Sequence, residues 1–390
     1  MTQEVKLTAK PGEVEFPKGL EGIIARESTK SFVDGQKGWL IYHGFTIEEL
    51  CKNSTFEEVS YLLLHDKLPT KAELDAFKGE LKQYREIPDG VYDLIASVAR
   101  YNVHPMAILR TAVSALALYD DEADDASWDA QERKALKLIA RMATISAAIG
   151  RARGDLEFVH PRSDLGHAAN FLYMLLGEEP DDLLERVMDV ILILHADHGC
   201  NASTFTSIVI ASSQSDLYSA VTGGIGSLKG PLHGGANERA MAMLDEIGEP
   251  EEAERKTLDK IAKKEKIMGF GHRVYKAYDP RAAMLKGYAD EITKRAGTEK
   301  WLRMAEIIER VMIEKLGEKG IFPNVDFYSG VVMSSMGIER ALFTPIFATA
   351  RVSGWVAHVL EQLADNRIFR PRFIYTGPME EKYIPLEERS

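Results

Sequence analysis

One stretch of the chain reads Pro180-Asp-Asp-Leu-Leu-Glu-Arg-Val-Met-Asp-Val-Ile-Leu-Ile-Leu-His195 and shows the pattern that dominates the sequence. Its apolar residues recur at the spacing that places side chains on one face of an α-helix, at Leu184, Val187, Met188, Ile191 and Leu194. Asp181 and Asp182 precede this pattern, and acidic side chains are favoured at a helix N-terminus. The stretch therefore predicts an α-helix that begins near Asp181.

Most of the chain after Phe45 repeats this helical pattern. A second apolar stripe runs from Trp301 to Met312 and is followed by Gly317, a residue type that commonly ends helices. No long alternation of strand and helix patterns appears, which argues against a doubly wound parallel sheet. We therefore expect an all-α fold.

One short region near the N-terminus has β character. Two apolar runs, Gly22-Ile-Ile-Ala-Arg26 and Gly38-Trp-Leu-Ile-Tyr42, lie on either side of the turn signal Asp34-Gly35. The region predicts a short β-hairpin that precedes the helices.

The composition excludes several classes of function. The chain has 390 residues, 45% of them hydrophobic, and a formal net charge of −12, which argues against binding of nucleic acid or of an anionic membrane surface. Only two cysteines occur, Cys51 and Cys200, which favours a reducing compartment. Residues Met1 to Phe16 lack the apolar core of a signal peptide, and no apolar run approaches the roughly 18 residues of a membrane helix. We expect a cytoplasmic protein.

Histidines and aspartates beside glycines are the candidates for chemistry, since glycine-rich loops can bend closely around a ligand. The first such segment is Gly230-Pro-Leu-His233-Gly-Gly-Ala-Asn237, which precedes a predicted helix. Backbone N–H groups near His233 would disfavour its cationic form, and a neutral imidazole N–H can stabilise an enolate. The alternative is a turn histidine without a catalytic role.

The second segment is cationic: Gly269-Phe-Gly-His272-Arg273-Val-Tyr-Lys276-Ala-Tyr-Asp279-Pro-Arg281. Clustered cations beside glycines in an acidic protein suit a ligand with carboxylates or phosphates. The alternative is a solvated basic loop.

The third segment, Asn324-Val-Asp326-Phe-Tyr-Ser-Gly330, places an acid between two apolar residues. Such a setting raises the pKa of a carboxyl group and suits a general base. The alternative is that Asp326 caps a helix that begins near Ser329.

The fourth segment, His195-Ala-Asp-His198, has two histidines at helical spacing and resembles half of a metal site. No further cluster of acids or histidines completes the ligand set, so we predict no metal. A metal-dependent hydrolase built on His195 and His198 is kept as an alternative.

Together and in this order, the motifs resemble the citrate synthase family, in its type I-like bacterial form. The resemblance spans roughly Gly22 to Gly377, and one departure is His43, where arginine is commoner in the family. The matching segments are His104-Pro-Met106, His195-Ala-Asp-His198 with Asn201-Ala-Ser-Thr204, Gly230 to Asn237, Gly269 to His272, Asp279-Pro-Arg281, Asn324-Val-Asp326, Arg351-Val-Ser-Gly-Trp355 and Arg370-Pro-Arg372.

The resemblance implies an acyltransferase that joins the methyl carbon of acetyl-CoA to oxaloacetate and then hydrolyses the thioester to give citrate and CoA. It implies that Asp326 removes the methyl proton and that His233 donates a hydrogen bond to the thioester oxygen. His272 would polarise the ketone of oxaloacetate. No cofactor or metal is implied beyond the CoA substrate itself.

The resemblance also implies the binding residues and the assembly. The expected oxaloacetate ligands are His198, Arg281, Arg351 and Arg370. Looser candidates for the CoA phosphates are Arg273 and Lys276. In the family the arginine that matches Arg370 comes from the neighbouring subunit, so we expect a homodimer with a shared active site, and higher oligomers are left open.

The implied architecture has two domains. A large helical domain would comprise residues 1–234 and 338–390, and a smaller helical domain would comprise residues 235–337. Two alternatives stay open on function: a 2-methylcitrate synthase, which shares the chemistry but takes propionyl-CoA, and a catalytically silent helical assembly protein.

Overall fold

The computed structural model describes residues 15–389. These residues form two compact units, a larger one of residues 28–367 and a smaller one made from the two ends of the chain. The expectation that Met1 to Phe16 is not a signal peptide falls almost wholly outside the described residues.

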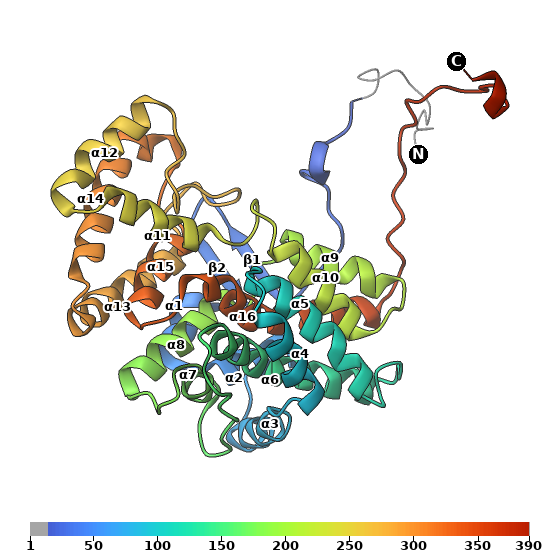
Figure 1. Cartoon of the computed structure of the whole chain (residues 1–390), viewed down its shortest axis with the longest axis horizontal. Coiled ribbons are helices and arrows are strands. Elements are labelled where there is room, and N and C mark those ends of the chain that lie inside the picture. The colour runs from blue at the N-terminus through green and yellow to red at the C-terminus, as the bar shows by residue number, and fades with distance from the viewer. Residues whose placement is uncertain (1–14, 390) are drawn as a thin grey trace. The chain divides into compact units, whose positions relative to one another are not determined.

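The larger unit is built almost entirely from helices, which confirms the all-α prediction (Figure 1). Its α-helices are α1 (Ile47–Asn53), α2 (Phe56–His65), α3 (Lys71–Gln83), α4 (Asp89–Ala99), α5 (Pro105–Leu116), α6 (Trp128–Arg153), α7 (His167–Leu176), α8 (Asp182–His195), α9 (Ala202–Ser212), α10 (Leu217–Leu228), α11 (Ala236–Ile247), α12 (Pro250–Ala262), α13 (Pro280–Ala296), α14 (Glu299–Leu316), α15 (Val325–Ser335) and α16 (Phe343–Ala364). None of the helices that the structure describes combines the length and the apolar character needed to cross a bilayer.

The helix boundaries read from local signals are correct at two places. The Asp181 side chain accepts the backbone N–H of Leu184 and caps α8, because a carboxylate satisfies N–H groups that have no partner within the helix. The helix α14 ends at Leu316, directly before Gly317.

The β region is a three-stranded antiparallel sheet and differs from the prediction in its first strand. β1 (Ser31–Asp34) pairs with β2 (Trp39–Tyr42), and β3 (Phe45–Thr46) pairs with the other edge of β2. The second predicted strand is correct, whereas residues Gly22–Arg26 are not a strand and belong to the smaller unit.

The turn explains this correction. The Asp34 carboxylate accepts the backbone N–H groups of Gln36 and Lys37, each at 3.0 Å, and Gly38 has a φ of 67°. When an aspartate side chain accepts the backbone N–H groups of the residues that follow it, the turn begins at that aspartate. The strand that precedes the turn therefore ends at Asp34, and its partner begins at Trp39.

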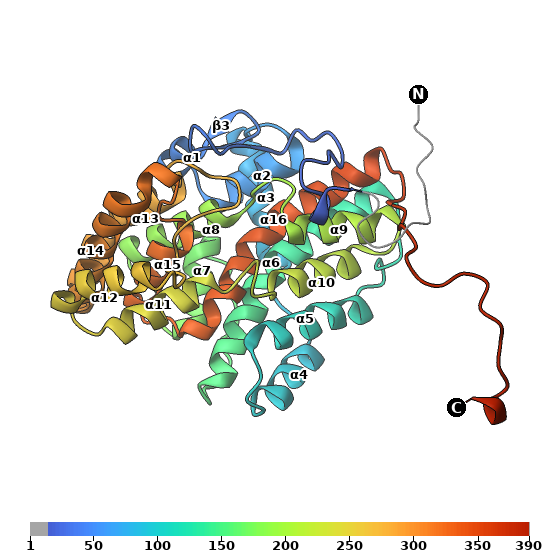
Figure 2. The same cartoon turned by 90° about the horizontal axis from the view of Figure 1, so that it is seen from above.

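The helix α16 forms the centre of the larger unit, and Figure 2 shows it crossing between the other helices. Most of its residues are buried, and it packs against α2, α6, α8, α9 and α10. A helix that is covered on all sides is part of the core. The guanidinium of Arg351 is thereby carried into the interior, where Arg351 is 1% exposed.

The helices α11 to α15 gather on one side of the larger unit, on the left in Figure 1. There α13 and α11 pack against α15, and α12 packs against α14. These are the helices of the predicted smaller domain, residues 235–337. The boundaries of that domain stay a prediction, because residues 28–367 form one compact unit here.

The smaller unit contains residues 15–27 and 368–389 and is mostly extended chain. It carries exposed apolar side chains from both ends of the sequence, among them Phe16, Leu20, Phe373, Tyr383 and Leu386. Arg370 belongs to this unit and is exposed.

Candidate active site

His233 lies in the loop between α10 and α11 and contacts the first turn of α9. Its Nε2 accepts the backbone N–H of Ser203 at 3.2 Å and lies 2.8 Å from the Ser203 hydroxyl. Asn201 caps the same helix end through its side-chain oxygen. The backbone N–H group near His233 thus belongs to α9, not to the helix that follows it in the chain. Because Nε2 accepts, the proton of a neutral imidazole lies on Nδ1.

The loop that carries His233 is held from α11. Arg239 donates through Nε to the Gly235 carbonyl at 3.1 Å and through Nη2 to the Pro231 carbonyl at 2.7 Å. From the other side, Trp355 of α16 donates its indole N–H to the Ser203 hydroxyl at 3.1 Å. The position of the imidazole is therefore set by three helices, α9, α11 and α16.

His272 lies in the loop between α12 and α13. Its Nδ1 accepts the backbone N–H groups of Val274 at 3.0 Å and Tyr275 at 3.2 Å. The proton of a neutral His272 is therefore on Nε2, the nitrogen that remains free to donate.

Three rings meet beside this loop. The His272 ring lies 5.2 Å from the His198 ring and 4.9 Å from the Tyr275 ring, measured between centroids. The Tyr275 hydroxyl lies 3.2 Å from Nε2 of His198. The structure thus brings together two of the histidines that the sequence singles out from distant segments.

Arg281 is buried and paired with Asp279. Its Nε and Nη2 donate to the two Asp279 oxygens at 3.0 and 2.8 Å, and the two residues are 3% and 1% exposed. Asp279 is also the N-cap of α13 and accepts the backbone N–H of Val325, the first residue of α15, at 3.2 Å. One carboxylate therefore joins the starts of two helices to a buried guanidinium.

Arg351 enters the site from α16. Its Nε donates to the His195 carbonyl at 2.7 Å, and its guanidinium lies 4.7 Å from the centre of the Phe347 ring. Burial lowers the pKa of Arg351 to about 10, which leaves the group cationic at neutral pH.

Asp326 lies in the first turn of α15, and the alternative that it caps a helix from Ser329 is wrong. Asn324 is the cap: its Oδ1 accepts the Asp326 N–H at 3.1 Å, and its Nδ2 donates to the Gly271 carbonyl beside His272 at 2.9 Å. The Asp326 carboxylate makes no hydrogen bond or ion pair within residues 15–389. Burial raises the pKa of Asp326 to about 6, although Arg281 acts in the opposite direction.

The three histidines of the site are neutral at physiological pH. Burial lowers the pKa of His233 and of His272 to about 4, with additional contributions from Arg351 and Arg281 respectively. Burial and Arg281 hold the pKa of His198 well below its usual range. The site therefore combines neutral N–H donors, buried guanidinium groups and one unpaired carboxylate.

Two predicted residues of the larger unit do not belong to this buried cluster. Arg273 and Lys276 are exposed on the His272 loop, where Lys276 Nζ lies 3.4 Å from the His272 carbonyl. Arg370 belongs to the smaller unit.

His195 does not share the surroundings of His198. Its Nδ1 lies 2.7 Å from the Ile191 carbonyl, and its ring packs edge-on against Phe347. Among residues 15–389, no group of three or more His, Cys, Asp or Glu side chains is arranged to hold a metal ion.

A buried pair that the sequence reasoning missed lies behind His198. Asp197 is fully buried and accepts a hydrogen bond from His358 Nε2 at 3.0 Å and another from the Ser31 hydroxyl. Although burial opposes it, the Asp197 carboxylate raises the pKa of His358 to about 9. One signal in the sequence could have indicated this pair: His358 follows Arg351 by two helical turns and so lies on the same face of the helix.

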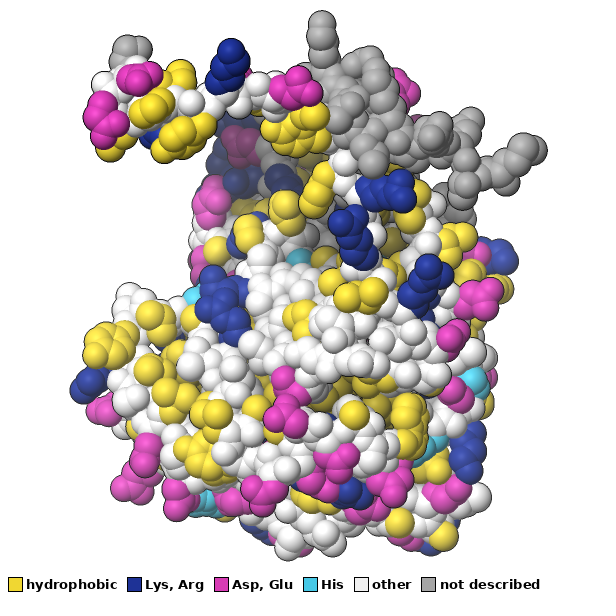
Figure 3. All heavy atoms as spheres, turned by 90° about the vertical axis from the view of Figure 1, so that its right-hand side faces the viewer, with side chains coloured by type: hydrophobic (Ala, Val, Ile, Leu, Met, Phe, Trp, Pro, Cys, Tyr) yellow, Lys and Arg dark blue, Asp and Glu magenta, His cyan; other side chains and the backbone are white. Residues whose placement is uncertain are grey.

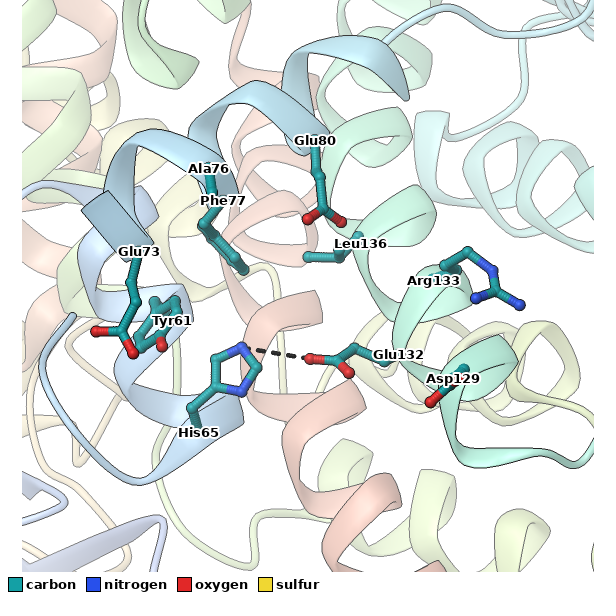
Figure 4. A pocket seen from close by; sticks show the side chains of 10 residues that line it. All are labelled: Tyr61, His65, Glu73, Ala76, Phe77, Glu80, Asp129, Glu132, Arg133 and Leu136. Atoms are coloured by element: carbon teal, nitrogen blue, oxygen red, sulfur yellow. Dashed lines mark ion pairs between the residues drawn. The ribbon is translucent and has the colours of Figure 1, made fainter. Parts of the chain in front are cut away.

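A surface hollow of about 410 Å³ lies elsewhere, between α2, α3 and α6 (Figure 4). It is rich in acidic side chains, and His65 in its wall lies 3.5 Å from Glu132. None of the residues predicted for the site lines it.

On the face of the larger unit drawn in Figure 3, acidic side chains gather along the lower part.

Comparison with known proteins gives consistent results. Residues 19–372 match the family model described as citrate synthase, C-terminal domain. The citrate synthase of Deinococcus radiodurans is 50% identical over 372 residues, which cover 95% of this chain and 98% of that protein. A citrate/2-methylcitrate synthase of Bacillus subtilis is 42% identical over 93% of this chain and 97% of its own.

Among solved structures, a citrate synthase from Thermoplasma acidophilum in a ternary complex with carboxymethyl coenzyme A and oxaloacetate superposes with a TM-score of 0.91. It is 37% identical and covers 96% of this chain and 100% of its own.

Proposed function

The chain belongs to the citrate synthase family, and we propose that it condenses acetyl-CoA with oxaloacetate and water to give citrate and CoA. The proposal rests on a carboxylate that can act as a base and on two histidines whose protonated ring nitrogen is fixed by backbone hydrogen bonds. Asp326 is a partly buried carboxylate with a raised pKa, while His233 and His272 each accept a backbone N–H at one ring nitrogen. Removal of a proton next to a carbonyl requires this combination of a base and a positioned donor.

In the first step Asp326 takes a proton from the methyl group of acetyl-CoA. The electron pair of the C–H bond forms the enolate, and the Nδ1–H of His233 donates to its oxygen. Because Ser203 occupies Nε2, the imidazole presents its only proton to the substrate. The low pKa of His233 keeps the ring neutral, so the imidazole stabilises the enolate by a hydrogen bond and not as a cation.

In the second step the enolate carbon attacks the ketone of oxaloacetate. His272 Nε2–H donates to the ketone oxygen and protonates the alkoxide that forms. The two backbone N–H groups at Nδ1 fix this tautomer in the same way as Ser203 does for His233. Water then attacks the thioester carbonyl and displaces the CoA thiolate, which releases citrate and CoA. Of the two protons of this water and the one held by Asp326, one restores the N–H of His272, one protonates the thiolate and one leaves to solvent.

The substrate carboxylates are assigned to the buried cations. Arg281 and Arg351 can each form paired hydrogen bonds with a carboxylate, and their charges act on His198, whose ring lies beside those of His272 and Tyr275. Support for oxaloacetate and a CoA thioester comes from the Thermoplasma acidophilum complex, which holds oxaloacetate and a CoA analogue. Arg273 and Lys276 remain candidates for CoA phosphates because they are exposed beside the site.

A CoA-release assay with oxaloacetate and either acetyl-CoA or propionyl-CoA tests the reaction. We expect turnover with acetyl-CoA to exceed that with propionyl-CoA, because relatives named only citrate synthase reach 50% identity, whereas the one named citrate/2-methylcitrate synthase is 42% identical. A preference for propionyl-CoA would assign the second activity, and no CoA release with either thioester would refute the proposal.

We further propose a homodimer in which Arg370 of each chain completes the active site of the other. The support is that Arg370 lies in a unit with extended chain and exposed apolar side chains, as expected of a segment that contacts another subunit. Mixing an inactive Asp326→Ala protein with an inactive Arg370→Ala protein should restore partial activity through hybrid dimers. No recovery after confirmed subunit exchange would contradict the shared site.

The predicted domains give a role to the two glycine segments that bound residues 235–337. Gly235 and Gly337 have φ values of 74° and 80°, so they suit hinge positions. Oxaloacetate held between Arg281 of the smaller domain and Arg351 of the larger one would favour a closed form, which then binds acetyl-CoA more tightly, by about 5–150-fold. Equal affinities of a non-reactive CoA analogue with and without oxaloacetate would contradict this closure.

A further inference from the structure

The β1–β2 hairpin contacts the chain on both sides of His198. Ser31 and Tyr42 are cross-strand partners, so their side chains point to the same face of the sheet. The Ser31 hydroxyl donates to the Asp197 carboxylate and accepts the Gly199 N–H at 2.9 Å. The Tyr42 hydroxyl donates to the Asp197 carbonyl at 2.8 Å and accepts the Asp197 N–H at 3.1 Å. The base of the hairpin thereby fixes residues 197 and 199, which flank His198.

The tip of the same hairpin contacts the His272 loop. The Gly35 carbonyl accepts the backbone N–H groups of Lys276 at 2.8 Å and Ala277 at 3.3 Å. These residues lie between His272 and Arg281 in the chain. The turn at the tip of the hairpin, which is distant in the sequence, therefore provides a backbone acceptor for the loop that carries His272.

The tip has no room for side chains at its two glycines. A Cβ atom on Gly35 would lie 2.1 Å from the Val274 carbonyl oxygen, and one on Gly38 would lie 2.7 Å from the Tyr278 carbonyl oxygen. Both obstacles are backbone atoms, which cannot swing aside as a flexible side chain can. Only Gly38 also has a positive φ, so at Gly35 close approach alone explains the glycine.

The two loops that the hairpin holds meet in the site. His198 from one loop and His272 from the other lie 5.2 Å apart between ring centroids, and Tyr275 contacts both. A group that sets the separation of two substrate-binding loops acts on catalysis without touching the substrate, because misplacement of reacting groups by about 1 Å can cost 10²-fold in rate.

We propose that the β1–β2 hairpin is a positioning element for the reaction, holding the His198 loop at its base and the His272 loop at its tip. This inference rests on the proposed function, in which both histidines contact oxaloacetate. The residues that carry it are Ser31 and Tyr42 at the base and Gly35 and Gly38 at the tip.

The test compares Gly35→Ala with Gly44→Ala. Gly44 follows β2 and has a φ of 90°, yet a Cβ there meets no atom within 4 Å. Gly44→Ala therefore strains the backbone without pushing on either loop, whereas Gly35→Ala pushes on the His272 loop without requiring a positive φ. The full-length protein is assayed for kcat, for KM of each substrate and for melting temperature.

We expect Gly35→Ala to lower kcat/KM for oxaloacetate by about 10²-fold, and Gly44→Ala to lower the melting temperature while kcat/KM stays within about twofold of the wild type. Ser31→Ala, which removes a hydroxyl and adds no atoms, should reduce kcat/KM in the same direction by a smaller factor. Ser31→Ala decides the matter if Gly35→Ala does not fold. Unchanged kcat/KM in the folded variants would overturn the proposal and leave the hairpin a structural element only.

Hydrogen exchange separates this inference from the proposed function. Gly35→Ala should speed exchange of the amides of residues 274–278, and Gly44→Ala should not, whatever reaction the protein catalyses. If the wild type releases no CoA but this difference is seen, the proposed function has failed and the hairpin still positions the loop. If the wild type is active but the two variants exchange alike, the hairpin proposal has failed and the function stands.

Discussion

Asp279 and Asp326 lie at the starts of two neighbouring helices, α13 and α15, and both are close enough to Arg281 to interact with its charge. Asp279 is the N-cap of its helix and accepts two backbone N–H groups and two guanidinium N–H groups. The N-cap of α15 is Asn324, so Asp326 lies two residues inside the helix end. The Asp326 carboxylate has no hydrogen-bond or ion-pair partner within the described chain.

This difference separates a structural carboxylate from a reactive one. A carboxylate that accepts several hydrogen bonds is stabilised as the anion and has no lone pair directed at a substrate. A partly buried carboxylate without such bonds keeps a raised pKa and an open acceptor, which a base requires. An asparagine cap at α15 allows this, because the amide satisfies the helix end and leaves the acid free.

The largest expected effect is on turnover. Asp326→Asn should lower kcat by about 10²–10⁴-fold, since the amide cannot take a proton from the substrate, while oxaloacetate affinity changes little. Steady-state kinetics at saturating oxaloacetate measures this. A variant that keeps a tenth of wild-type kcat would show that Asp326 is not the base.

The same substitution at Asp279 should instead act on stability. Asp279→Asn leaves the buried Arg281 guanidinium without its counter-charge, and breaking such a pair typically costs about 3–5 kcal/mol. Denaturant unfolding of both variants gives the comparison. Equal unfolding free energies for Asp279→Asn and the wild type would mean that the pair does not hold the two helices.

Sequence patterns predicted the elements better than they predicted these roles. Helical periodicity fixed the all-α class and the ends of α8 and α14, because caps and apolar spacing are local properties. The first strand was misplaced because the Asp34 side chain, not the apolar run Gly22–Arg26, decides where the turn begins. The motifs named the residues of the site, but their order in the chain could not show which residue caps which helix.

The partners of the site residues come from distant segments, and no local pattern reports them. Ser203 at Nε2 of His233 lies thirty residues away in the chain, and the contact of Asp197 with His358 joins the loop between α8 and α9 to α16. Such contacts depend on tertiary packing and form only once the helices and their loops are assembled.

The pH dependence of activity sharpens the assignment of the base. Asp326 must be ionised to accept a proton, so kcat/KM, which reports the free enzyme, should fall about tenfold per pH unit below its pKa of about 6. The charges of Arg281, Arg239 and Arg351 favour ionisation of Asp326, and the charge of Asp279 opposes it. The acidic side of the pH profile therefore depends on all of these charged groups. His233 and His272 have pKa values of about 4 and stay neutral over this range. A kcat/KM that is constant from pH 5 to 7 would contradict the assignment, and melting temperatures over the same range provide the control for unfolding.

The smallest expected effect is on stability at Asp326, and its sign is opposite to that of the effect at Asp279. The pKa of Asp326 is raised from 3.8 to about 6 in the folded protein, so the folded state binds its proton more tightly than the unfolded state. The ionised group therefore destabilises the fold above pH 6, and this cost disappears as the pH falls below the unfolded value. Asp326→Asn removes the charge and should stabilise the protein at pH 7.5 by on the order of 1–2 kcal/mol, with less gain at pH 4.

Asp279→Asn is the matched control, because the same chemical change should lower stability where the carboxylate is fully bonded. Denaturant unfolding at the two pH values measures both. If Asp326→Asn destabilises the protein at pH 7.5, the carboxylate has native partners after all, and the contrast between a bonded and an unbonded aspartate would not hold.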